Sequence, residues 1–415
     1  MKKFLNPLLF TMFIICLTAC GSGEKKNEYA PAASAYDDDV AFLKKYSDVI
    51  ELTDSEMKSR IAVMPGLQAR VMTSAAGSPE NLSYGWINKA VFESGDTSVH
   101  MNAYGGEERF WLGPEGGQFS IFFEKGSAFT LENWRTPRLI DLDAYELVSS
   151  TPHAATFTKT AELKNYSGTI FNIKINREIK VLDLSDAFPH LGIEADTALN
   201  TVAYQSINKV ENTGNVAWNK KTGLLSIWLL GMFNPSPNLI MVIPFIEGPV
   251  EELGPIVNDD YFGKVPADRL KVGKGIIYFR GDGEYRSKIG LSPARAKDVL
   301  GSYDPASRTL TIVKYSKGEP TDDYVNSKWE IQAEPYKGDV VNAYNDGIPA
   351  PGVKPLGPFY ELESSSHAKE LKPGESLMHT QTTFHFQGEE KKINRLALTI
   401  LGVSIAEISS AFAAN

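Results

Sequence analysis

Short runs of β-forming residues, separated by turn residues, recur over roughly 300 residues of this chain. The runs at 60–64, 119–123, 171–175, 310–315 and 382–386 are rich in Val, Ile, Thr, Tyr and Phe, and clusters of Gly, Pro, Asn and Asp lie between such runs. This spacing is typical of stacked antiparallel sheets, whereas βαβ units would need a helical pattern between successive strands. We therefore expect a mainly β fold of antiparallel sheets, without internal repeats.

Helical patterns are confined to the two ends of this β region. Residues 37–46 begin with three aspartates and carry apolar side chains at Val40, Phe42 and Leu43, which predicts a short N-terminal helix. From Lys391 onward the apolar spacing becomes helical again, and 404–407 has the form of a capping box. We expect C-terminal helices over about 391–413 that pack against an edge or face of a sheet.

The first twenty residues have the pattern of an export signal. Lys2 and Lys3 precede a mostly apolar stretch that is too short to span a membrane comfortably, and it ends in Ala19-Cys20. This ending resembles the lipobox of bacterial lipoproteins, which implies cleavage after residue 19 and lipid on Cys20. Residues 20–35 are then a polar tether, and the expected location is the bacterial cell envelope, with the membrane as partner. The alternative is an ordinary secretory signal that happens to contain a cysteine.

The remaining composition limits how the chain is stabilised and what it binds. Cys16 lies in the segment expected to be removed, so Cys20 alone remains and no disulfide can form within one chain. With 42% hydrophobic residues the chain can bury a large core, and we expect one β domain over 36–415, although the length also allows two domains. A net charge of -9 argues against nucleic acid as a partner.

Common catalytic motifs are missing from the sequence. It contains no Walker loop, Rossmann glycine pattern, HExxH, CxxC pair or convincing Gly-x-Ser-x-Gly elbow. The six histidines lack the spacing of zinc ligands, while a carboxylate-rich calcium site is left open. We assign no metal and no cofactor.

Residues 104–118 contain the side chains that carbohydrate sites use. Glu107, Glu108 and Arg109 can make paired hydrogen bonds with sugar hydroxyls, and Trp111 can pack on the C–H face of a sugar ring. The glycines around them allow close approach of the backbone. The alternative is a turn-rich hairpin with a surface Arg–Glu pair.

Two further segments supply polar groups. Within 282–290, strand alternation places Arg286 and Lys288 on one face, where two cations could bind an acidic or polyhydroxylated ligand. The alternative is an ordinary solvated strand face. Asp304 follows at a predicted turn, and Asn345 and Asp346 lie in a loop rich in Gly and Pro, where binding groups concentrate.

The C-terminal part of the β region carries a family resemblance. Glu361 and Glu363 share one face of a predicted strand, and residues 371–375 read Leu-Lys-Pro-Gly-Glu before a strand over 379–386. This order resembles the C-terminal signature of the galactose-mutarotase-like superfamily, in which a Leu-Glu pair ends a strand before such a turn. More closely, the chain looks like a family of bacterial lipoproteins of unassigned function placed in that superfamily, also through its 105–118 and 282–290 segments.

The resemblance implies a β-supersandwich and a base on the anomeric hydroxyl at Glu363. It also places Asp304 near the position of the superfamily's sugar-binding aspartate, although the local motif differs. The epimerase histidine acid has no match in 210–215, and the spacing from Glu363 to Pro373 is shorter than in epimerases. Arg109, Lys288 or His190 could substitute as the acid. His379 and His385 share one face of a predicted edge-like strand, where we expect half-exposed sheet residues.

The sequence thus predicts a lipid-anchored protein that recognises a carbohydrate around Glu363, Arg109 and Trp111, with Glu363 as general base if it acts on the sugar. Catalysis needs both a base and an acid, and the missing histidine leaves turnover open. The alternatives are a non-catalytic glycan-binding lipoprotein and a structural envelope protein.

Overall fold

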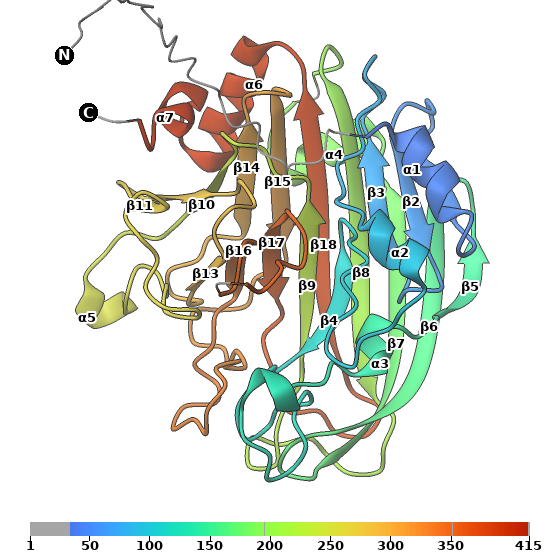
Figure 1. Ribbon diagram of the computed structural model, residues 1–415, viewed down its shortest axis with the longest axis vertical. Helices are drawn as coiled ribbons and strands as arrows, with labels where there is room; N and C mark the ends of the chain where they lie inside the picture. Colours follow the sequence, from blue (N-terminus) through green and yellow to red (C-terminus); the bar gives the residue numbers. More distant parts are fainter. Residues whose placement is uncertain (1–33, 195, 351, 414–415) are drawn as a thin grey trace, which may run out of the picture.

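The computed structural model describes residues 34–194, 196–350 and 352–413. The predicted signal segment, Cys20 and nearly all of the predicted tether lie outside these residues. Within them, the chain forms two stacked layers of antiparallel strands with short helices at the ends (Figure 1). The prediction of a mainly β, antiparallel two-layer fold is confirmed. No helix of the described residues is long and apolar enough to cross a membrane.

The larger layer is a ten-stranded sheet in the order β11-β12-β10-β14-β15-β18-β8-β7-β6-β5, with every neighbouring pair antiparallel. Its strands are β5 (Glu146–Ser150), β6 (Ala154–Lys164), β7 (Ile170–Val181), β8 (Asn200–Asn212), β10 (Ile240–Pro244), β11 (Leu270–Val272), β12 (Ile276–Arg280), β14 (Val299–Asp304), β15 (Thr309–Tyr315) and β18 (Ser376–Gln387).

The second layer combines a five-stranded and a three-stranded sheet. The five-stranded order is β13-β16-β17-β9-β4, and the three-stranded order is β1-β2-β3. A bridge between Val71 and Glu108 joins β3 to the residue before β4. The strands are β1 (Ile50–Thr53), β2 (Arg60–Met64), β3 (Arg70–Ala75), β4 (Arg109–Gly113), β9 (Ser226–Phe233), β13 (Ser287–Leu291), β16 (Val341–Asn345) and β17 (Tyr360–Ser365).

The burial of side chains differs between the two layers. Along β7 buried and more exposed residues alternate, so only one face of this strand packs against the core. Every residue of β4, β9, β16 and β17 is buried. One face of the five-stranded sheet therefore packs on the sandwich core, and loops cover the other face.

The helices lie at the margins of the sandwich, and the two predicted helical ends are confirmed. Ser404 and Glu407 form the predicted capping box, and the C-terminal helices pack through Ile393, Leu396 and Ile408 on the ten-stranded sheet. The helices are α1 (Tyr36–Leu43), α2 (Lys89–Ser94), the 3-10 turn η1 (Leu131–Asn133), α3 (Arg138–Asp141), α4 (Leu184–His190), α5 (Val250–Leu253), α6 (Glu390–Leu396), the π-helical η2 (Ala397–Leu401) and α7 (Ile405–Ser409).

Two local expectations are wrong. The apolar run 119–123 is irregular rather than a strand, because the Ser120 hydroxyl accepts a hydrogen bond from the Phe122 backbone N–H and so competes with ladder pairing. His379 and His385 are buried instead of half-exposed, because β18 lies between β15 and β8 and is not an edge strand.

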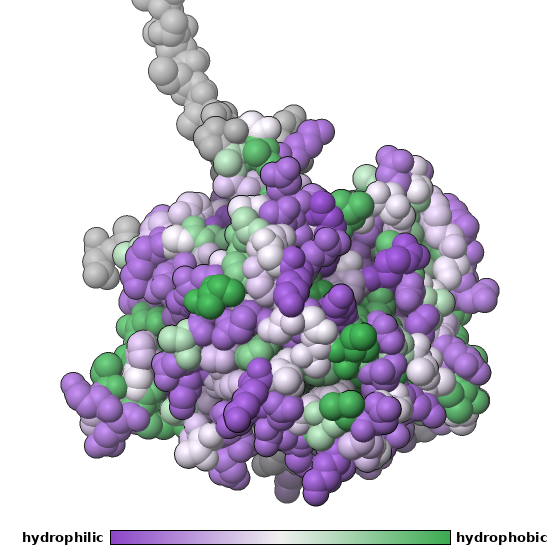
Figure 2. Space-filling model, turned by 90° about the horizontal axis from the view of Figure 1, so that it is seen from below, coloured by the Kyte–Doolittle hydropathy of each residue, from purple (hydrophilic) through white to green (hydrophobic). Residues whose placement is uncertain are grey.

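Hydrophobic residues on the face seen from below form separate groups among hydrophilic ones (Figure 2).

Candidate functional site

Strand register gathers most of the predicted site residues on the loop-covered face of the five-stranded sheet. Lys288 on β13 lies opposite Tyr344 on β16, and Tyr344 lies opposite Glu361 on β17. Two residues further along β17, Glu363 shares this face with Glu361, as the sequence predicts. Trp228, Arg109 and Trp111 complete the face from β9 and β4. We refer to this surface as the Glu363 face.

The Glu363 carboxylate is the best-held group on this face. Its side chain is fully buried, and the Lys288 ammonium group donates to both oxygens at 3.0 and 2.9 Å. The Trp228 indole N–H donates to one of these oxygens at 2.9 Å. The same ammonium group lies 4.7 Å from the Trp228 ring centroid and 5.7 Å from the Tyr261 ring centroid. Two donors and two aromatic rings therefore fix the ion pair in place.

A second buried ion pair lies beside the first. Arg109 donates to the Glu361 carboxylate, and its guanidinium carbon lies 5.2 Å from the Trp111 ring centroid. Burial raises the pKa of Glu361 to about 7, an effect that Arg109 opposes and the Glu363 charge reinforces. Each carboxylate of β17 is thus paired with its own cation, Glu361 with Arg109 and Glu363 with Lys288.

Two buried donors on this face have no partner among the described residues. Arg109 Nε and Trp111 Nε1 are both shielded from solvent without a hydrogen-bond acceptor. Buried donors are normally satisfied, so each such group calls for an acceptor such as water or a ligand oxygen. The two side chains contact each other, with the Arg109 guanidinium carbon 5.2 Å from the Trp111 ring centroid, next to Glu361.

Glu115 is a candidate that sequence reasoning missed. Burial raises its pKa to about 7; the Lys288 and Arg286 charges and a hydrogen bond from Trp329 oppose this rise, while the Glu363 charge adds to it. These influences place Glu115 in the electrostatic neighbourhood of the Lys288–Glu363 pair. Its position within a glycine-rich segment is the only sequence signal, and nothing there distinguishes it from the other carboxylates of 104–118.

Arg286 and Asp346 lie at one edge of the Glu363 face. The Arg286 guanidinium carbon stacks 3.8 Å from the Phe262 ring centroid. Asp346 accepts hydrogen bonds from the Tyr344 hydroxyl at 2.8 Å and the Gly357 backbone N–H at 2.9 Å. Burial raises the pKa of Asp346 to about 6, and these hydrogen bonds and the Arg286 charge oppose the rise. Both residues therefore border the site without touching Glu363.

Three residues that the sequence analysis groups with this site lie elsewhere. Glu107 accepts from Ser74 at 2.8 Å and pairs with His385 at 2.7 Å. Asn345 alternates to the opposite face from Tyr344, where it supports the turn at Gly283. Asp304 holds its own turn by accepting from the side chains of Ser236 and Ser307.

The neighbouring charges of segment 104–118 are also arranged differently from the surface-pair alternative. Glu108 is fully buried and accepts from Arg177 at 2.9 Å, inside the sandwich. Arg109, the next residue in the chain, is 3% exposed. His190, one possible substitute acid, ends α4, which packs against the outer side of the ten-stranded sheet through Phe188. It is therefore separated from Glu363 by the sandwich.

The Glu363 face is nearly closed to solvent. Glu361 and Lys288 are 6% and 8% exposed, and the rings of Trp228 and Tyr261 lie against the Lys288 ammonium group. Phe262 is 46% exposed and packs on Tyr344 at 6.0 Å between ring centroids, so it stands at the boundary with solvent. The face offers paired carboxylates, two cations and indole rings, which suits hydrogen bonding to a polyhydroxylated molecule.

Comparison with protein families gives one match. The Family of unknown function (DUF6786) matches residues 34–412, nearly all of the described chain. None of the curated proteins compared with the sequence matches it.

Comparison with solved structures returns matches of low sequence identity over most of the chain. A galactose mutarotase-like protein from Lactobacillus casei is 11% identical with a TM-score of 0.46, covering 81% of this chain and 100% of that chain. A galactose mutarotase related enzyme from Lactobacillus acidophilus is 7% identical with a TM-score of 0.45, covering 82% and 98%. The Slr1438 protein from Synechocystis sp. PCC 6803 is 10% identical with a TM-score of 0.47, covering 83% and 96%.

Proposed function

The chain belongs to a family of unknown function, and from the chemistry of its own site we propose that it recognises a carbohydrate on the Glu363 face. The observation that carries the proposal is a pair of buried donors without partners in the described part of the chain, Arg109 Nε and Trp111 Nε1, beside two carboxylates. Sugar oxygens supply the acceptors that these donors lack, and the indole rings supply a surface for C–H groups.

We further propose that Glu363 acts as a general base on the bound sugar. The Leu362-Glu363 pair resembles the superfamily signature at the base position, and the ammonium group of Lys288 holds the carboxylate in place through both oxygens. In ring opening, the carboxylate would accept the proton of the anomeric hydroxyl while an acid protonates the ring oxygen.

As the acid we propose Glu115, which lies in the electrostatic neighbourhood of the Lys288–Glu363 pair. Burial raises its pKa to about 7, so a large fraction is protonated at neutral pH, whereas the epimerase histidine has no match in 210–215. Glu361 has a similar pKa but is held by Arg109, which favours its ionised form.

Sugar exchange measurements test this assignment. Incubating the protein with neutral aldoses and following anomer interconversion by NMR should show catalysed exchange, which Glu363→Gln abolishes while binding persists. Glu146→Gln, on the exposed strand β5, is the matched control and should leave exchange unchanged. Unchanged exchange in Glu363→Gln would refute the base assignment, and failure of every sugar to bind would refute carbohydrate recognition.

A second candidate function, glycan binding without turnover, has its own support. Both Glu363 oxygens are occupied by Lys288 and Trp228, so they are engaged before any ligand arrives. Under this function glycans bind, Trp111→Ala weakens binding, and no sugar changes its anomeric form. The exchange experiment separates the two functions directly.

We also propose that the protein is held at the bacterial cell envelope by lipid on Cys20. The support is the resemblance of its signal segment to a lipobox, with a cysteine directly after Ala19. Wild-type protein should fractionate with membranes and carry an acylated N-terminal cysteine by mass spectrometry. Cys20→Ser should be released to the soluble fraction, and an unmodified Cys20 would contradict the proposal.

A further inference from the structure

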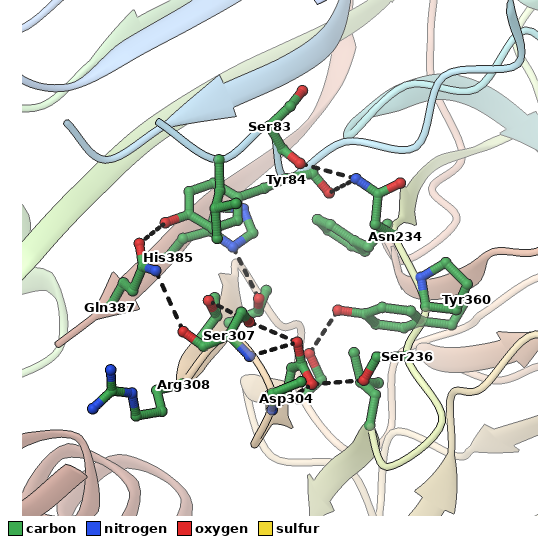
Figure 3. Close-up of a pocket in the computed structure, with 18 of the residues that line it drawn as sticks. Ser83, Tyr84, Asn234, Ser236, Asp304, Ser307, Arg308, Tyr360, His385 and Gln387 are labelled. Carbon is green, nitrogen blue, oxygen red and sulfur yellow. Dashed lines mark hydrogen bonds between the residues drawn. The ribbon is translucent and has the colours of Figure 1, made fainter. Parts of the chain in front are cut away.

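A separate cavity opens at the end of the sandwich where the β14–β15 hairpin turns. Its volume is about 480 Å³, which matches pockets that hold small ligands. It lies on the other side of the five-stranded sheet from the Glu363 face, because Tyr360 points between the layers and Glu361 points away from them. We refer to it as the hairpin cavity (Figure 3).

Aromatic rings form the floor of the hairpin cavity. The Tyr84 ring stacks on the His385 ring with centroids 4.2 Å apart and an interplanar angle of 12°. Phe233 packs beside them, 5.4 Å from the Tyr360 ring and 5.8 Å from the His385 ring. Such rings offer flat apolar faces to the C–H groups of a ligand.

Hydrogen bonds hold this floor in a single arrangement. His385 uses one ring nitrogen with the Thr311 hydroxyl at 2.9 Å and the other with Glu107 at 2.7 Å. The Tyr360 hydroxyl pairs with Ser302 at 2.8 Å. Both ring nitrogens of His385 are engaged, so the ring is held in place. A floor that is formed before the ligand arrives lowers the entropy cost of binding.

The rim is polar and is also built in advance. Gln387 links the Tyr84 hydroxyl to the Ser307 carbonyl, and Asp304 accepts from the side chains of Ser307 and Ser236 (Figure 3). These contacts tie segments from four parts of the chain into one ring around the opening. The rim therefore presents donors and acceptors at fixed positions.

Arg308 is the exposed cation of this rim. It occupies a left-handed backbone conformation, φ 51°, at the hairpin turn, where glycine or asparagine is favoured. No hydrogen bond or ion pair of its guanidinium group is found among the described residues, so its five N–H donors are free to bind a ligand. In Figure 3 this group lies at the edge of the cavity and points away from the other labelled residues, and the exposed side chain can change rotamer to reach a ligand at the mouth.

The charges around the cavity select the ligand class. Glu80 and Asp304 line the cavity together with Arg308, so cation and carboxylates oppose each other. A strongly anionic ligand would meet the carboxylates, and a cationic ligand would meet the guanidinium group. A neutral molecule with many hydroxyl groups, each both donor and acceptor, fits the rim, and its C–H faces fit the aromatic floor.

We infer that the hairpin cavity is a second binding site, distinct from the Glu363 face, for a neutral saccharide of one or two rings. Arg308 and Gln387 bind hydroxyl groups at the rim, and the Tyr84–His385 stack supports the ring. This inference is independent of catalysis at Glu363.

Saturation-transfer NMR on the full chain tests the inference, with glucose, galactose, N-acetylglucosamine, lactose and maltose as probes. The experiment uses the Trp111→Phe background, which removes one unpartnered donor of the Glu363 face and keeps an aromatic ring in the core, so that signal from the Glu363 face is weakened. At least one probe should bind, and Arg308→Gly should weaken it by about tenfold or more, because charge-assisted hydrogen bonds are lost. Arg308→Lys should recover part of the affinity.

Folding and binding effects are separable in this design. Glycine adopts the φ of position 308 without strain, so Arg308→Gly should fold at least as stably as the parent. Met57→Gly is the matched control, since Met57 is 76% exposed with φ 59° and lies outside the cavity; it should leave binding unchanged. Unchanged affinity in Arg308→Gly, or no binding of any probe in this background, would overturn the site. Tighter binding of glucuronate than glucose would overturn its ligand class.

Discussion

The ammonium group of Lys288 lies 3.0 and 2.9 Å from the two carboxylate oxygens of Glu363, although 75 residues separate them in sequence and β16 runs between their strands. Both side chains are buried. Taking charges out of water costs free energy that only their mutual attraction and hydrogen bonds offset. Neutralising either residue alone therefore leaves the other charge buried without its partner, which destabilises the fold.

Removing the lysine should destabilise the fold more than removing both charges. Lys288→Met leaves a buried carboxylate with Trp228 as its remaining partner, which should lower the free energy of unfolding by about 3–5 kcal/mol. The double variant Lys288→Met, Glu363→Gln should recover part of this loss in urea denaturation. Lys314→Met removes an exposed pair with Asp298 and should cost at most about 1 kcal/mol. Equal losses for the two lysines would contradict a buried ion pair.

The pH dependence of stability should carry the signature of Glu115. Burial raises its pKa from 4.5 to about 7, so the folded chain keeps a proton that the unfolded chain has released. Its contribution to stability is present in full below about pH 4.5 and is lost as pH rises through about 7. Glu115→Gln should therefore gain stability relative to wild type between pH 5 and pH 8, measured by denaturation at each pH.

Glu407 provides a control of opposite sign. Hydrogen bonds from Ser404 lower the pKa of this carboxyl, so its contribution is present above its ordinary pKa and is lost as pH falls through the folded-state value. The stability deficit of Glu407→Gln should shrink at low pH. A parallel pH response of the Glu115 and Glu407 variants would show that neither assignment holds.

Gly290 should control how tightly the Glu363 face is covered. A Cβ at this position would lie 2.1 Å from an Asp339 carboxylate oxygen, which accepts from the Tyr261 hydroxyl at 2.5 Å. Gly290→Ala should displace Asp339 and cost about 1–3 kcal/mol. It should also increase acrylamide quenching of tryptophan fluorescence by loosening Tyr261, which flanks the Lys288 ammonium group together with Trp228. Gly273→Ala, whose Cβ would meet its nearest atom at 3.2 Å, should change quenching little. Quenching that stays at the wild-type level in Gly290→Ala would argue against this cover.

The capping box of α7 should make a measurable contribution to stability. The Ser404 hydroxyl accepts from the Glu407 backbone N–H at 3.2 Å, and α7 packs on the outer face of the large sheet. Ser404→Ala should lower the free energy of unfolding by about 1 kcal/mol, visible as a lower Tm in thermal denaturation. Ser409→Ala, at the exposed end of the same helix, should have a smaller effect, and the reverse order would contradict the cap.

Sequence patterns predicted those features that depend on near neighbours. Alternation correctly separated Lys288 from Ile289 and placed Glu361 and Glu363 on one face. The capping box at Ser404 was equally readable, because its partners are three residues apart. The same local reasoning misplaced Asn345, which follows Tyr344 on β16 and so points to the opposite face.

Local sequence patterns could not predict which residues are buried or which strands lie next to each other. The sequence leaves open whether Glu108 belongs to a carbohydrate site or to a surface pair, yet Arg177, 69 residues away, lies against it inside the sandwich. Glu115 was one carboxylate among several until loops enclosed it. His379 and His385 looked half-exposed because the sequence does not reveal whether a strand lies at an edge.

The sequence alone determined a mainly β chain with helical ends, the faces of its strands and, through the resemblance around Glu363, where to look for a site. Tertiary structure decided that Lys288 and Arg109 pair with different carboxylates of β17, and that Asp304 belongs to another cavity. The physical reason is that a strand's two-residue period orients its side chains, whereas long-range packing selects its neighbours.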